Sequence, residues 1–163
     1  MAFISEQQID EAASALNDSE AAYQKALSSF QEKQPVLLSY FFTENFQAFT
    51  QAEKEYLLYL LLIIWEAFRR SGASAPLITE PQLAAAEEFN WSLMEQSRAR
   101  GFHQRLDAFF HAYPQEDLLA FAEDALGEDE EEQIVTPEGR EAMFICLKTA
   151  IDCLVQAPQP DMG

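Results

Sequence analysis

Residues 50–72 have the sequence TQAEKEYLLYLLLIIWEAFRRSG, and this stretch decides the fold. Thr50 and Glu53 have the spacing of a capping box, in which each side chain binds a free backbone N–H at the start of a helix. From Tyr56 to Trp65 the helix is apolar on every side. A helix without a polar face must be surrounded by other elements, so we expect this helix to lie at the centre of the molecule.

The rest of the chain also favours helices. Glycine is scarce, with 5 residues, while alanine, leucine, glutamate and glutamine are abundant. Capping residues, prolines and glycines divide the sequence into helical segments, and no segment has a convincing strand pattern. We therefore predict an all-α, single-domain bundle of about seven helices over residues 1–157, with a short proline-containing tail at 158–163. The expected helices cover about 5–33, where the chain could bend at 17–19, and about 35–49, 50–70, 79–100, 102–112, 114–126 and 136–155.

The chain carries a large negative charge, because 28 acidic side chains against 10 basic ones give a formal net charge of −18. Apolar residues make up 48% of the chain, which is too many for a disordered acidic tail. The charge repels phosphate backbones and anionic lipid headgroups, so we expect neither a nucleic-acid nor a membrane partner. The N-terminus has no secretory signal, and no apolar run approaches the ~20 residues that a bilayer needs. These features predict a cytoplasmic protein.

The two cysteines, Cys146 and Cys153, are seven positions apart in one predicted helix. At about 1.5 Å per residue they lie roughly 10 Å apart along the helix axis, which is too far for a disulfide bond. We interpret both as reduced thiols inside the bundle.

The negative charge is concentrated in one region. Between Arg105 and Arg140 the sequence has eleven acidic residues and no basic one. Three interpretations of this region stay open: the acidic residues are solvated, the arginines just upstream fold onto them, or they bind a basic protein partner. Five of the acidic residues form a run in a predicted loop: Glu128, Asp129, Glu130, Glu131 and Glu132.

His103, Asp107 and His111 follow one another at intervals of four residues, within about an 80° arc of the predicted helix 102–112. Neighbours at this spacing can share a metal ion, but the outer histidines are about 12 Å apart and cannot both bind it. A metal site would need carboxylates from another helix. Neither histidine has a glutamate three residues before it, unlike the di-iron bundles. The candidate outside carboxylates are Glu87, Glu88, Glu116 and Asp117.

Trp91 is the residue that we single out as a candidate binding anchor. Positions on a helical wheel place Phe89 and Leu93 on one side of the helix 79–100, with Trp91 roughly opposite among charged residues. An exposed tryptophan on a charged face is typical of a protein-binding surface. The alternative is that a further helix covers this side as well.

No motif of a known catalytic or nucleotide-binding class is present, and the sequence implies no cofactor. We therefore predict a non-enzymatic protein-interaction module that presents an acidic surface to a basic partner, with Trp91 and residues 128–132 as its contacts. The alternative function is a metal-binding helical protein that uses His103, Asp107 and His111. A third possibility is that the acidic face mimics a nucleic acid.

Overall fold

The computed structural model describes residues 3–42, 49–73, 76–127 and 135–155. In this part of the chain it is all-α, with no strand, and its helices pack into one bundle, as predicted. The helices are α1 (Glu6–Asn17), α2 (Glu20–Lys33), α3 (Pro35–Phe41), α4 (Gln51–Arg70), α5 (Glu80–Gln96), α6 (Phe102–Arg105), α7 (Asp107–Phe110), α8 (Glu116–Leu126) and α9 (Pro137–Leu154).

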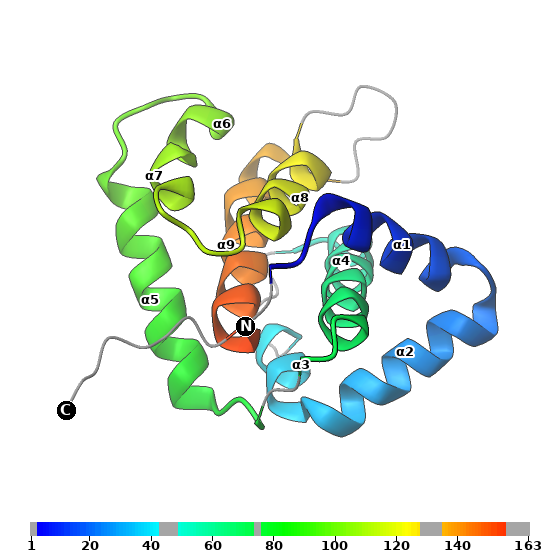
Figure 1. Ribbon diagram of the computed structural model, residues 1–163. Coiled ribbons are helices and arrows are strands. Elements are labelled where there is room, and N and C mark those ends of the chain that lie inside the picture. Colours follow the sequence, from blue (N-terminus) through cyan, green and yellow to red (C-terminus); the bar gives the residue numbers. More distant parts are fainter. Residues whose placement is uncertain (1–2, 43–48, 74–75, 128–134, 156–163) are drawn as a thin grey trace.

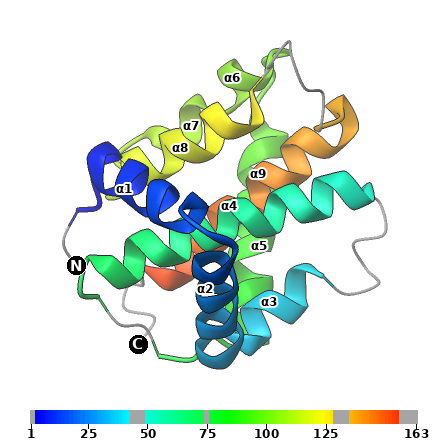
Figure 2. The same cartoon turned by 90° about the vertical axis from the view of Figure 1, so that its right-hand side faces the viewer.

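Helix α4 is the central helix that its apolar sequence predicts. Every residue from Leu60 to Phe68 is buried. The predicted capping box is present, because Thr50 N donates to Glu53 Oε1 at 2.9 Å and Glu53 N donates to Thr50 Oγ1 at 3.0 Å. The amphipathic helices α1 and α2 pack on one side of α4, and α9 packs on another (Figures 1 and 2).

Helix α9 is a second helix of the interior. All residues from Met143 to Ile151 are buried, including Lys148 and Thr149. Figure 1 shows α9 between α4 and α5, with α8 lying across one end. The bundle therefore buries two neighbouring helices, and α1, α2, α5 and α8 cover them.

Glu53 joins the starts of the two central helices. Its side chain is buried, and beyond its capping role Oε2 accepts hydrogen bonds from Thr136 N at 3.0 Å and Thr136 Oγ1 at 2.9 Å. Thr136 is the N-cap of α9, so one carboxylate binds donors at the beginning of both α4 and α9. Such a position is favourable for a carboxylate because the N-terminus of a helix carries partial positive charge.

Two predicted helices are broken in the structure. The segment 5–33 divides into α1 and α2 at Ser19, within the stretch 17–19 where a bend was expected. The extended backbone of Ser19 lets its hydroxyl accept from Ala22 N at 3.0 Å as a new N-cap. The segment 102–112 divides into the short helices α6 and α7 at Leu106, which is buried. Just after α7, Ala112 has a φ of 55°, which turns the chain toward α8.

Among the described helices, none is long and apolar enough to cross a membrane. The predicted helix 35–49 ends earlier, with α3, and residues 43–48 lie outside the described part of the chain. The predicted acidic loop, Glu128–Glu132, and the predicted tail also lie outside the described residues.

Candidate functional site

The structure reverses the expected exposure of the two aromatic residues of α5. Trp91 is half-buried and packs against the hydrophobic core, whereas Phe89 is 62% exposed. Trp91 and Phe89 lie on opposite sides of α5, as the helical wheel predicts, but the exposure expected of Trp91 as a binding anchor was wrong, and Phe89 is the exposed aromatic side chain of this helix.

The reason for the reversal is that polar residues lie on the inner face of α5. Asn90 is fully buried between Leu83 and Met94, which are one to two turns away on the same face. Glu87, also on this side, accepts a hydrogen bond from the Tyr40 hydroxyl at 2.9 Å. Because the inner face of α5 is not uniformly apolar, hydrophobicity alone does not identify it.

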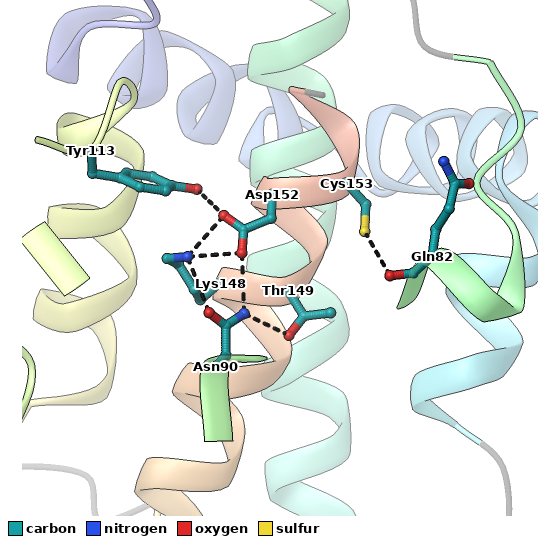
Figure 3. Close-up of polar contacts among 7 residues, drawn as sticks. All are labelled: Gln82, Asn90, Tyr113, Lys148, Thr149, Asp152 and Cys153. Carbon is teal, nitrogen blue, oxygen red and sulfur yellow. Dashed lines mark hydrogen bonds and ion pairs between the residues drawn. The ribbon is translucent and has the colours of Figure 1, made fainter. Parts of the chain in front are cut away.

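Asn90 belongs to a polar network that joins α5 to α9 (Figure 3). Lys148 Nζ lies 2.9 Å and 2.8 Å from the two carboxylate oxygens of Asp152 and 3.1 Å from Asn90 Oδ1. Asn90 Nδ2 donates to Thr149 Oγ1 and to Asp152 Oδ2, both at 3.1 Å. The Tyr113 hydroxyl, from the segment between α7 and α8, donates to Asp152 Oδ1 at 2.6 Å.

The polar groups of this network are hydrogen-bond partners of one another. The ammonium group of Lys148 has three acceptor atoms around it, and it also lies 4.6 Å from the centre of the Tyr113 ring. Burial and the neighbouring Asp152 raise the pKa of Tyr113 well above its ordinary value, so its hydroxyl stays a donor. These groups hold α5 and the α7–α8 connection onto α9, which is a structural function.

The two cysteines are free thiols, Cys146 buried and Cys153 partly buried. Burial, with a further contribution from Asp152, raises the pKa of Cys153 to about 12. Its Sγ donates to the carbonyl oxygen of Gln82 at 3.8 Å (Figure 3). A thiol with a raised pKa and a carbonyl partner is a poor nucleophile.

The residues of the predicted metal site do not come together. His103 Nδ1 lies 2.8 Å from Glu123 Oε2 on α8, while Asp107 and His111 are exposed and are separated from His103 by the break at Leu106. Two candidate carboxylates have other partners, since Glu87 accepts from Tyr40 and Asp117 accepts from the backbone of α1. Within the described ranges, no group of three or more His, Cys, Asp or Glu side chains is arranged to hold a metal ion.

Of the three arginines upstream of the acidic region, Arg105 is paired with a carboxylate, whereas Arg98 and Arg100 are exposed. Arg105 Nε lies 3.1 Å from Glu141 Oε2, and its Nη2 donates to Met94 O at 3.1 Å near the end of α5. The carboxylate that Arg105 contacts is thus on α9.

A groove of about 390 Å³ lies between α1 and α8, which we call the α1–α8 groove. Figures 1 and 2 show these two helices side by side at the edge of the bundle. Its lining consists of apolar side chains and carboxylates only, with no lysine or arginine among the described residues that form it. The apolar residues are Ile9, Ala120, Phe121 and Ala125, and the acidic residues are Glu6, Asp10, Asp117 and Asp124.

A second hollow, of about 220 Å³, lies among α1, α2 and α4. It differs in charge, because Lys25 and Arg69 line it together with Glu66. Arg69 is paired with the largely buried Glu66, with Nη2 2.6 Å from Oε1. The uniformly acidic lining is therefore a property of the α1–α8 groove and not of every hollow on the surface.

Comparison with protein-family models, with curated proteins and with solved structures gives no match to this chain. The geometry and the charge of the described residues are therefore the basis of the proposal below.

Proposed function

We propose that this protein is a non-enzymatic interaction module that binds a basic segment of a partner protein through the acidic surface of α1 and α8. The observation that carries the proposal is the composition of the α1–α8 groove, whose charged side chains are all carboxylates. The proposal includes a cytoplasmic location, in keeping with the two free thiols.

Electrostatics supports a basic partner. A chain with a formal net charge of −18 attracts cationic surfaces and slows the approach of anionic ones. Electrostatic complementarity raises association rates and selects partners by the sign of their charge. Exposed carboxylates act over a Debye length of about 10 Å at 0.1 M salt, so the association should weaken as salt concentration rises.

The acidic residues Glu128–Glu132 remain part of the proposed binding surface. They begin two positions after the end of α8, which supplies half of the groove. Trp91 is not used as an exposed anchor here, because it packs against the core.

Charge-matched variants test the proposal. The probe is a fluorescently labelled synthetic peptide of lysine, arginine and leucine, and binding is measured by fluorescence anisotropy at several salt concentrations. The test variant carries Glu6→Gln, Asp10→Asn and Asp124→Asn. The control variant carries three neutralising changes on the exposed face of α5: Glu80→Gln, Glu88→Gln and Glu95→Gln.

If α1 and α8 form the binding surface, the test variant should bind at least about tenfold more weakly than the control, a difference of 1.4 kcal/mol. Equal losses in the two variants would show that the peptide responds only to total charge, and the proposed surface would then be wrong.

A further inference from the structure

The residues that line the α1–α8 groove recur at helical spacing, which places their apolar and acidic side chains on one face of each helix. On α8 its residues recur at intervals of three and four, from Asp117 through Phe121 to Ala125. On α1 the same spacing joins Glu6, Ile9 and Asp10. Side chains at these intervals lie on the same side of a helix, so the carboxylates form a rim around an apolar floor.

The floor is hollow because α8 contributes small side chains. Ala120 and Ala125 line it with methyl groups only, and the buried Ile9 and half-buried Phe121 complete it. The volume of about 390 Å³ lies within the roughly 300–1,000 Å³ range of ligand-binding clefts. This is enough room for one large apolar side chain of a partner.

Hydrogen bonds join α1 and α8 at one end of the groove, where both helices begin. Glu6 N donates to Asp117 Oδ2 at 2.9 Å, and Ile4 N donates to the buried Gln115 Oε1 at 2.9 Å. The capping box of Ser5 fixes the start of α1 at the same point. A preformed groove binds a ligand without first paying the entropy of ordering its own walls.

The chemistry of the lining selects the occupant. An apolar floor needs an apolar side chain, whereas the rim has the exposed carboxylates of Glu6, Asp10 and Asp124 and no cation from the described chain. A single segment that satisfies both has a large apolar residue flanked by lysine or arginine. A bare metal ion would leave the floor empty, and the described residues offer no metal-binding group of three.

We infer that the α1–α8 groove binds an amphipathic basic segment of a partner protein. One apolar side chain of this segment packs on Ile9 and Phe121, and its basic side chains pair with Asp10 and Asp124. This inference rests on the proposed function and adds to it an apolar contact, which charge alone does not imply.

Two peptides of equal charge separate the apolar contact from the electrostatic one. Both carry the same lysines and arginines, and one has leucine where the other has serine. Burying a leucine side chain stabilises a complex, so the wild-type protein should bind the leucine peptide at least about tenfold more tightly, a difference of about 1.4 kcal/mol.

A variant that fills the groove tests whether the preference for leucine comes from the groove. Ala120→Phe fills the floor without any change in charge, and it should reduce the affinity for the leucine peptide to that for the serine peptide. Ala85→Phe makes the same substitution on the exposed face of α5 and should leave the preference intact. Should Ala120→Phe fail to fold by circular dichroism, Phe121→Ala removes part of the floor and should lower the preference at least threefold, about 0.6 kcal/mol.

The outcomes distinguish the two proposals. Equal binding of the two peptides to the wild-type protein, or a full leucine preference in Ala120→Phe, would overturn the inference about the groove while leaving the acidic binding surface intact. Equal losses in the two charge variants described above would overturn the proposed function itself.

Discussion

Replacing Lys148 by methionine tests whether the α5–α9 network holds the bundle together. The side chain of Lys148 is 5% exposed, and its ammonium group contacts both oxygens of Asp152 and Asn90 Oδ1. Methionine keeps most of the apolar stem, so the substitution removes mainly the charge and its hydrogen bonds.

The expected loss of stability depends on the partners that Asp152 keeps in the variant. Breaking a buried ion pair by removing one partner costs about 3–5 kcal/mol, because the other charge is left without its counterion. Asp152 is 17% exposed in its side chain and still accepts from Tyr113 and Asn90, which reduces this cost. We therefore expect Lys148→Met to lower the free energy of unfolding by about 3 kcal/mol, the lower end of that range.

Urea denaturation followed by circular dichroism measures this loss. Lys33→Met, which removes an exposed lysine, is the matched control and should change stability by no more than about 0.5 kcal/mol. The double variant Lys148→Met/Asp152→Asn should be more stable than the sum of the two single losses predicts, by at least about 1 kcal/mol. A Lys148→Met loss no larger than that of the control, or strict additivity with Asp152→Asn, would refute this interpretation of the network.

Three further outcomes are expected. Gly139→Ala should destabilise the protein by about 1–3 kcal/mol in urea denaturation, because an added Cβ would overlap the buried Glu53 carboxylate; an unchanged midpoint would contradict this packing. Trp91→Ala should cost about 2 kcal/mol or more and Phe89→Ala no more than about 0.5 kcal/mol, and the reverse order in thermal unfolding would show that the exposure of α5 is assigned wrongly. Because the pKa of Cys153 is raised from 9.0 to about 12, the folded state holds the thiol proton more tightly than the unfolded state; the resulting stability is present below pH 9 and is lost as pH rises toward 12. Cys153→Ala should therefore lose less stability than the wild type between pH 9 and 11, and parallel urea midpoints across that window would exclude the thiol as a contributor.

The fold could be predicted where local sequence signals and burial agree. The capping residue Thr50 marks the start of α4, and Thr79, the first residue of the predicted helix 79–100, is the N-cap of α5 in the structure. The uninterrupted apolar character of residues 56–65 identifies the central helix, because such a helix is stable only when other elements surround it.

Helix breaks were harder to predict because they depend on competing local interactions. The apolar stripe of residues 5–33 lies on both sides of Ser19, so the sequence allowed a bend at 17–19 but did not require a break; in the structure the Ser19 hydroxyl caps a new helix. At Leu106 the burial of the side chain against the core accompanies the break between α6 and α7. The apolar spacing in the sequence is the same whether or not the helix is continuous.

Of the candidate site, the sequence predicted the acidic character but not the groove. The acidic character of residues 105–140 predicts a negatively charged surface, but not that α1 adds Glu6 and Asp10 to it. Contacts between distant segments create the groove, and a single sequence does not record them. One signal for the buried network was present, since Lys148 is the one charged residue between Glu141 and Asp152, and Asp152 follows it one turn later in the same helix.

The most direct test of the proposed binding surface is a nuclear magnetic resonance titration of the ¹⁵N-labelled protein with the unlabelled leucine peptide. The amide shifts should be largest along the α1–α8 groove, at Ile9, Phe121 and Ala125, and smaller on the exposed face of α5. The serine peptide should move the amides of the acidic rim without the same change at Phe121. Shifts centred on Phe89, or spread evenly over all acidic residues, would contradict the account.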